Sequence, residues 1–314
     1  MIGLDDIRAA AGRIAGKVRR TPVAEAANLK DPLPGDVSVV LKLELMQVTG
    51  SFKARGATNR LACLDPAQLG HGIVTASGGN HGIATARAGV LAGVPTTVFV
   101  PGTAAPSKIE KIRAWGAALH VVGSAWEDAN AAAQRWVKET GAVYFHPFAD
   151  PDVVAGQGTL GLEILEQVPD VGTILVAMGG GGLVSGVATA VKALRPDVRV
   201  IGIEAEGSPA LLRSLEAGRN VALERVTTRV ATMSCARTDD RIFEVVRRHV
   251  DSIVLVSDEA MLSAARWLWF EMGLAADLSG AAALAALRGA RIDARGAERI
   301  CAIVCGAGPD AITA

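Results

Sequence analysis

The strongest constraint on the fold is a regular alternation of short, β-branched apolar runs with alanine-rich stretches along the whole chain. The apolar runs are predicted to be strands and the alanine-rich stretches helices. Several runs, such as 98–100 and 174–176, are apolar at every position, which is typical of parallel strands covered by helices on both faces. The predicted class is therefore α/β. The predicted strands are 37–45, 73–77, 96–101, 119–123, 143–146, 174–178, 198–204, 253–256 and 300–305.

Charge and cysteine content narrow the function classes. The 314 residues carry 32 basic and 32 acidic side chains, so the net charge is zero. A chain without net charge is not expected to bind nucleic acid or an anionic membrane, and a small molecule is the expected partner. The four cysteines form no CxxC pair, which disfavours a disulfide scaffold or a zinc site and favours a reducing cytoplasm. The acidic N-terminus does not resemble an export signal, and the apolar stretch 174–191 is interrupted by glycines, which favours strand, turn and helix over a membrane span.

The first chemical candidate is Lys53, in the sequence TGSFKARG at positions 49–56. Ser51 is predicted to be the N-cap of an alanine-rich helix, which puts Lys53 in the first turn. The helix dipole and burial beside Phe52 are both expected to lower the pKa of its amine, which makes Lys53 a candidate nucleophile toward carbonyl groups. The alternative is an ordinary surface lysine at a helix start.

Three glycine-rich turns follow predicted strands, where open α/β sheets bind ligands. SGGNHG (77–82) offers free backbone amides to an anion and the Asn80 amide to a polar group, or is an ordinary turn with an Asn-capped helix. GGGGL (179–183) suits a phosphate approached closely by backbone amides, or is a flexible turn. In VCGAG (304–308), Cys305 ends the last strand and is either a site residue or a buried structural thiol.

In combination, these features resemble the fold-type II pyridoxal-phosphate enzymes, in the threonine/serine dehydratase and serine racemase branch. The resemblance implies a two-domain α/β fold like that of the tryptophan synthase β subunit, with mainly parallel sheets flanked by helices and the cofactor in the cleft. We expect a small domain, 51–144, inserted into a large domain of 1–50 plus 145–314. The matching segments are Arg20-Thr21-Pro22, 42–53, 77–82, Pro106-Ser107-Lys108, 156–159, 179–183 and Ser279-Gly280.

The resemblance also implies roles for individual residues. Lys53 is the catalytic residue and the attachment point of pyridoxal 5'-phosphate, with Phe52 beside the cofactor ring. Asn80 contacts the ring hydroxyl, and Cys305 faces the pyridine nitrogen. The phosphate is held by Gly179, Gly180, Gly181, Gly182 and Leu183. The substrate carboxylate is received by the loop of Ser77, Gly78, Asn80 and His81.

The implied reaction is β-elimination from a β-hydroxy amino acid, L-threonine or L-serine, giving a 2-oxo acid and ammonia. Amino-acid racemisation and hydroxyaspartate dehydration are the alternatives within the fold, and a non-catalytic ligand-binding pseudoenzyme is the alternative of another class. We expect a cytoplasmic homodimer or homotetramer. Because the sequence ends soon after the last site strand, we expect no C-terminal regulatory domain.

Some positions depart from the family pattern. Racemases of the family carry a serine where this chain has Gly78, and a glycine cannot carry a proton, so dehydration is favoured over racemisation. A serine introduced there is expected to leave the fold intact. The segment 232–237 is atypical and is expected to alter the substrate side of the pocket. Glu204 has no acidic partner at Ala210, so we expect a surface acid at a strand end and no metal site.

Overall fold

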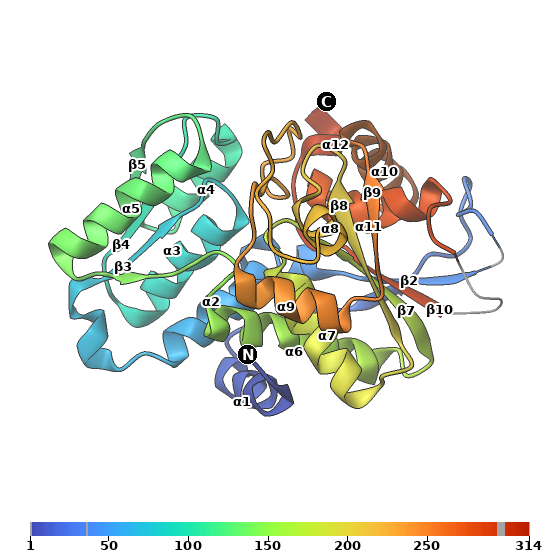
Figure 1. The fold of residues 1–314 in the computed structure, drawn as a ribbon, viewed down its shortest axis with the longest axis horizontal. Coiled ribbons are helices and arrows are strands. Elements are labelled where there is room, and N and C mark those ends of the chain that lie inside the picture. The colour runs from blue at the N-terminus through green and yellow to red at the C-terminus, as the bar shows by residue number, and fades with distance from the viewer. Residues whose placement is uncertain (1, 36, 294–298, 314) are drawn as a thin grey trace.

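The computed structural model describes residues 2–35, 37–293 and 299–313. Within this part of the chain the strands form two separate sheets, and Figure 1 shows them in two lobes that lie side by side. The strand and helix alternation expected from the sequence is present, and every predicted strand is found with limits shifted by a few residues. The prediction of an α/β class is confirmed.

The larger sheet has six strands in the order β1-β2-β10-β7-β8-β9. All neighbours are parallel except β1, which runs antiparallel to β2 and was not predicted from the sequence. At three residues, β1 is too short to show a hydrophobic period. The strands are β1 (Val23–Glu25), β2 (Ser38–Lys42), β7 (Val171–Ala177), β8 (Arg199–Ala205), β9 (Ser252–Val256) and β10 (Arg299–Ile303).

The smaller sheet is parallel throughout, in the order β5-β4-β3-β6. Its strands are β3 (Ile73–Ala76), β4 (Thr96–Val100), β5 (Ala118–Val121) and β6 (Val143–Tyr144). Helices α3 (Asn80–Ala92) and α4 (Pro106–Ala114) pack beside Val98 and Val100, whereas α5 (Trp126–Thr140) packs beside Phe99. Because successive strand residues face opposite sides, these helices cover both faces of the sheet.

Helices also flank the larger sheet. In Figure 1, α6 and α7 lie on the side of α1, and α10 and α11 lie on the other side. One continuous core of buried aliphatic side chains joins these helices to the strands. The remaining elements are α1 (Leu4–Ile14), α2 (Lys53–Ala62), α6 (Pro151–Gln167), α7 (Gly182–Leu194), α8 (Ala210–Glu216), α9 (Asp240–His249), α10 (Asp258–Met272), α11 (Leu278–Arg288), α12 (Asp310–Thr313) and the 3₁₀ turns Glu44–Met46, Val48–Gly50 and Pro66–His71.

The apolar stretch 174–191 consists of the end of β7, the glycine turn and most of α7, as the sequence predicts. In the described part of the chain, none of the helices combines the length and the apolar character that a membrane crossing requires. In a parallel sheet the carboxyl ends of the strands share one edge, so the turns after β7 and β10 lie at the same edge of the larger sheet.

Candidate functional site

Backbone hydrogen bonds of the preceding segment hold Lys53 at the junction of the two sheets. The segment before it is fastened to the chain that continues β10: Phe52 N donates to Cys305 O at 3.2 Å, and Ala307 N donates to Gly50 O at 2.8 Å. Lys53 itself is the first residue of α2. The prediction that Ser51 caps this helix is wrong, because the cap position is Phe52 and the buried Ser51 hydroxyl has no hydrogen-bond partner.

The Lys53 amine faces the segment that leads from β6 of the smaller sheet to α6. Its Nζ donates to the carbonyl oxygen of Pro147 at 2.5 Å and lies 5.1 Å from the centre of the Phe52 ring. Removal from water lowers the pKa of this amine to about 8 from the ordinary 10.5, against a smaller opposing effect of Cys305 and Cys235. A large fraction of the amine is therefore neutral at mildly alkaline pH.

Helix packing fixes Lys53 relative to the glycine turn before α7. Helix α6 crosses α2 where a Cβ on Gly156 would lie 2.7 Å from Gly56 Cα, and it crosses α7 where a Cβ on Gly186 would lie 2.5 Å from Gly158 N. Such contacts leave no room for any side chain. Two helices that begin at candidate site segments are thus held at a fixed spacing through α6.

A buried ion cluster anchors the same helix. Arg55, two residues after Lys53, donates to Glu44 and to Glu163 at 2.7 Å in each case, and Lys42 also donates to Glu163 at 2.7 Å. Arg55, Glu44 and Lys42 are fully buried. Removing one member would leave an uncompensated charge in the interior, so the cluster fixes the start of α2 against the larger sheet.

The tetraglycine turn has a steric explanation at each position. A Cβ on Gly180 would lie 2.4 Å from the Phe148 ring, one on Gly182 would lie 2.6 Å from Phe148 O, and one on Gly179 would lie 2.9 Å from Thr232 O. Gly181 has a φ of +87°, which favours glycine. Packing alone thus explains four glycines in a row, so a phosphate site here rests on the unpaired N–H groups at the start of α7.

Asn80 begins α3 and is not a cap, since Gly79 precedes the helix without a side-chain bond. Its side chain is buried between two charged groups, with Lys108 Nζ donating to Oδ1 at 2.6 Å and Nδ2 donating to Asp277 Oδ2 at 2.9 Å. Cys305 lies nearby, and its Sγ donates to Ser279 O at 3.4 Å. Burial raises the pKa of the Cys305 thiol to about 12, so the thiol is neutral.

The loop before α3 has little free space. Ser77 Oγ accepts a hydrogen bond from Gly79 N at 3.3 Å. A Cβ on Gly78 would lie 2.4 Å from Ala104 Cβ, which no real pair of carbons tolerates. A serine at position 78 therefore requires the turn that carries Ala104 to shift, and the expectation that it leaves the fold intact stays a prediction. The sequence could not show this contact, because Ala104 belongs to the turn after the neighbouring strand β4.

His81 points away from the loop. Its Nε2 donates to Phe145 O at 3.0 Å, its Nδ1 is buried without a partner, and the side chain is 2% exposed. Burial, reinforced by Lys53, lowers the pKa of His81 to about 3, so the ring is neutral. A contribution of this residue to substrate binding would therefore come from its backbone N–H, and the substrate-loop roles stay predictions.

The start of the atypical segment 232–237 lies between the two glycine turns. A Cβ on Gly79 would lie 3.3 Å from Thr232 Cγ2, and the backbone of Thr232 and Met233 packs on Gly179. Thr238, a little further on, donates from its hydroxyl to Gly180 O at 2.8 Å. The segment thus contacts both the candidate substrate loop and the candidate phosphate turn.

Glu204 is not a surface acid, which corrects the sequence-based expectation. It is fully buried, and its two carboxylate oxygens accept from the N–H groups of Leu211 and Leu212 at 2.9 Å each. Burial raises the pKa of Glu204 to about 7, while these two hydrogen bonds act against the rise. The carboxylate caps the start of α8. Across the described ranges, no cluster of three or more His, Cys, Asp or Glu side chains could hold a metal ion.

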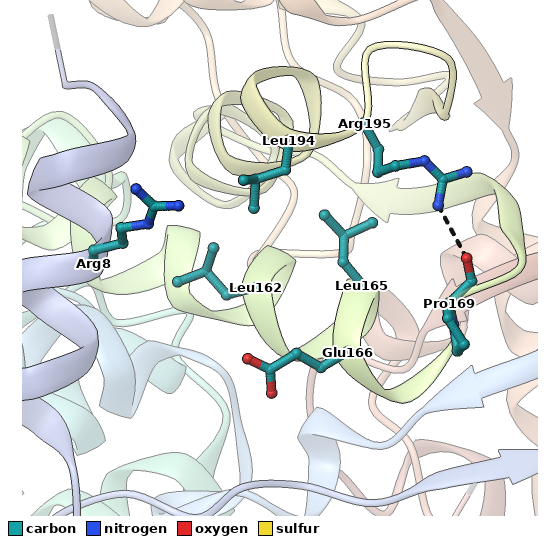
Figure 2. Close-up of a pocket in the computed structure, with 7 residues that line it drawn as sticks. All are labelled: Arg8, Leu162, Leu165, Glu166, Pro169, Leu194 and Arg195. Carbon is teal, nitrogen blue, oxygen red and sulfur yellow. Dashed lines mark hydrogen bonds between the residues drawn. The ribbon is translucent and has the colours of Figure 1, made fainter.

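A surface groove lies elsewhere, between α1, α6 and α7. Figure 2 shows its apolar floor of Leu162, Leu165 and Leu194, with Arg8 and Arg195 at its two sides. Its volume is about 420 Å³, and Arg195 donates to Pro169 O at 3.0 Å. None of its lining side chains contacts Lys53, so the groove is separate from the candidate site.

Some residues at the site were not identified from the sequence. Asp277 precedes the quoted Ser279-Gly280 pair, and an Asp before an alanine-rich helix is an N-cap signal that could have drawn attention to it. His146 was also missed. Its Nδ1 accepts from Phe148 N at 3.2 Å and Ala149 N at 3.0 Å and so shapes the turn that presents Pro147 O to Lys53.

Known proteins resemble this chain over nearly its whole length. Residues 14–306 match the family described as pyridoxal-phosphate dependent enzyme. The chain belongs to this family. It is 39% identical to an L-threonine ammonia-lyase of Thermotoga maritima, over 99% of this chain and 76% of that protein. It is 37% identical to a phenylserine dehydratase of Ralstonia pickettii, over 99% of this chain and 95% of that protein.

The fold agrees with a solved structure as well. Maize serine racemase superimposes with a TM-score of 0.90 at 34% identity, over 97% of this chain and 93% of that one. The predicted fold-type II architecture, with two sheet domains, is therefore confirmed. The limits of the small domain, 51–144, stay a prediction.

The residues at the junction fit the family's cofactor. The Lys53 amine with its lowered pKa suits an aldehyde, the bare N–H groups at the start of α7 suit a phosphate, and the free hydrogen of the Asn80 amide suits a phenolic oxygen. The neutral Cys305 thiol, whose hydrogen is directed to Ser279 O, suits a pyridine nitrogen that carries no proton. A carboxylate at position 305 would instead hold a proton on the ring nitrogen.

Proposed function

We propose that this protein is a pyridoxal-phosphate-dependent ammonia-lyase that converts a β-hydroxy amino acid into a 2-oxo acid and ammonia, with L-threonine or L-serine as the substrate. The observation that supports this most is the Lys53 amine, which has a pKa lowered to about 8 and is held at the junction of the two sheets. The similar threonine ammonia-lyase and phenylserine dehydratase support the same reaction type.

When bound, the cofactor withdraws electrons from the substrate and acidifies its α-proton. Lys53 Nζ accepts that proton, because a pKa near 8 combines a neutral form with useful basicity. The N–H groups of the Ser77–His81 loop receive the substrate carboxylate. Asn80 and Cys305 orient the ring, Phe52 packs beside it, and Gly179 to Leu183 hold the phosphate.

Proton transfer occurs from one face alone. Gly78 has no side chain, and Ala104 occupies the place where one would start, 2.4 Å from an ideal Cβ. Racemisation needs a second acid or base on the opposite face, so the loop supports elimination over inversion. Serine racemase activity remains the second candidate, because of the likeness to the maize enzyme.

The substrate is tested with purified holoenzyme and four compounds: L-threonine, L-serine, threo-3-hydroxyaspartate and threo-3-phenylserine. We expect equal amounts of 2-oxo acid and ammonia from threonine or serine, and a loss of roughly 10³-fold or more in Lys53→Ala. Turnover of the acidic or aromatic substrate alone would overturn the choice of substrate. A holoenzyme inactive with all four would support a pseudoenzyme.

We further infer a cytoplasmic homodimer. Support comes from the four cysteines, which are free thiols, and from Trp269 and Phe270 on α10, which are 46% and 68% exposed. Twofold dimers are the commonest oligomers. Light scattering coupled to size-exclusion chromatography should give twice the mass of the chain, and a monomer would contradict this.

A further inference from the structure

Lys108 and Asp277 form an ion pair that connects the two halves of the molecule. Lys108 Nζ lies 3.3 Å from Asp277 Oδ2, and the side chains are 16% and 6% exposed. Lys108 belongs to α4, which packs on the smaller sheet, and Asp277 caps α11, which packs on the larger one. The pair therefore crosses between the two sheets in a largely water-excluded place, where an ion pair is screened little by salt.

The same two charges enclose the Asn80 amide. Lys108 Nζ donates to Asn80 Oδ1 at 2.6 Å, and Asn80 Nδ2 donates to Asp277 Oδ2 at 2.9 Å. An ammonium group can only donate and a carboxylate can only accept, so the amide can adopt only one of its two orientations. One Nδ2 hydrogen is used in this way and the other is left for a further acceptor.

Further hydrogen bonds complete both ends of the pair. Lys108 Nζ also donates to Ala307 O at 3.0 Å. Asp277 Oδ1 accepts from Gly280 N and from Ser279 Oγ at 2.8 Å each. A Cβ on Gly306 would lie 2.8 Å from both Asn80 Nδ2 and Asp277 Oδ2, so the turn after β10 must be bare to admit them. The arrangement is built into the fold and is not a chance surface contact.

We propose that Lys108 and Asp277 are positioning residues, which hold the Asn80 amide in one orientation and connect the two sheets beside the site. We call this ion pair the clasp. The group that Asn80 meets is the cofactor ring hydroxyl, and this part rests on the proposed function. The clasp itself does not, because it is formed by this chain alone. Neither residue needs to touch substrate to have its effect.

The first test measures pyridoxal phosphate binding to the cofactor-free chain by absorbance. We expect Lys108→Met to weaken binding about tenfold or more and to shift the absorption maximum of the bound cofactor, with partial rescue in Lys108→Arg. Arg113→Met, an exposed position further along α4, is the control that removes a cation from the same helix, and it should stay within about twofold of the wild type. Lys108→Met with unchanged affinity and spectrum would overturn the positioning role.

Coupling between the two residues is tested with Asp277→Asn, which keeps a capping oxygen and removes the charge. If the residues act as one unit, Lys108→Met combined with Asp277→Asn should bind the cofactor about as well as Lys108→Met alone. Additive losses would show that the residues act separately.

A second readout separates the clasp from the proposed function. Amide hydrogen exchange of the cofactor-free protein should speed up in Lys108→Met at the starts of α3 and α11 and at residues 305–308, and not in Arg113→Met. If the wild type fails to bind pyridoxal phosphate and Lys108→Met still shows this faster exchange, the proposed function is refuted and the clasp is supported. Unchanged exchange would refute the clasp.

Discussion

The reactivity proposed for Lys53 depends on where its amine is held more than on the helix that carries it. The sequence suggested two reasons for a lowered pKa, the helix dipole and burial, and burial is the leading cause in the structure. The partner of the amine is the backbone carbonyl of Pro147, 94 residues away in sequence. That contact depends on how the two sheets pack together, so no local pattern around Lys53 could reveal it.

The lowered pKa of Lys53 can be measured directly. In competitive labelling of the cofactor-free protein with an amine-acylating reagent, Lys53 should reach half-maximal reactivity near pH 8, whereas exposed lysines do so near 10.5. Cys305→Asp places a carboxylate near the amine and should move the midpoint upward, while Cys305→Ser should not. A midpoint near 10.5 in the wild type would contradict the lowered pKa.

Glu204 predicts a pH dependence of stability. Its pKa is about 7 in the folded chain and near 4.5 when unfolded, so the folded state holds the proton more tightly. The stabilisation that protonated Glu204 gives the folded state is complete below pH 4.5 and is lost as the pH rises through 7. Relative to Glu204→Gln, the wild-type free energy of unfolding should fall by about 3 kcal/mol between pH 4.5 and 8. Urea unfolding at several pH values checks this, and a constant difference would show that Glu204 does not titrate there.

At the scale of elements, the site is assembled by helix crossings that require glycine. Gly56, Gly156, Gly158 and Gly186 let α2, α6 and α7 approach so closely that Lys53 and the turn before α7 have a fixed separation. The buried cluster around Arg55 acts on the same helix. Helix α6 therefore sets the relative position of α2 and the turn before α7, which carry the proposed chemistry.

Gly156→Ala tests these crossings. Its Cβ would lie 2.7 Å from Gly56 Cα and Arg55 O, so α2 must shift, and overpacking of this kind costs about 1–3 kcal/mol of stability. Pyridoxal phosphate affinity should fall with it. Gly12→Ala in α1 is the control, because nothing lies within 4 Å of its Cβ and it should stabilise the chain by about 0.5–1 kcal/mol. Equal behaviour of the two variants in thermal and urea unfolding would contradict a tight crossing.

The sequence predicted elements better than contacts. Long apolar runs predict β3, β4, β7, β8 and β10 because their hydrophobic pattern is local, whereas β1 depends on pairing with β2. The glycine turns and Lys53 could be singled out from their residue types.

What the sequence missed depends on tertiary contact. The cap of α2, the burial of Glu204, the closeness of Gly78 to Ala104 and the partners of Asn80 each join segments far apart in the chain. No periodicity or local motif encodes which residue of a distant segment will lie opposite.

At the scale of the whole molecule, the candidate site belongs to neither sheet alone. Lys53 and Cys305 are joined to the larger sheet through the chain after β10, whereas Asn80 and Lys108 come from helices of the smaller one. Figure 1 shows α2 running between the two lobes. A change in the angle between the sheets would separate the lysine from the loop proposed to bind the substrate carboxylate, so closure and chemistry are expected to be coupled.

The most direct test of a one-base elimination is the product balance with L-serine. A single reaction of the holoenzyme is sampled over time for pyruvate, ammonia and D-serine, the last by chiral chromatography. We predict pyruvate and ammonia in equal amounts, almost no D-serine, and a loss of activity of roughly 10³-fold or more in Lys53→Ala. D-serine forming as fast as pyruvate would reveal a second proton donor that Gly78 cannot provide, and full activity in Lys53→Ala would show that another group removes the proton.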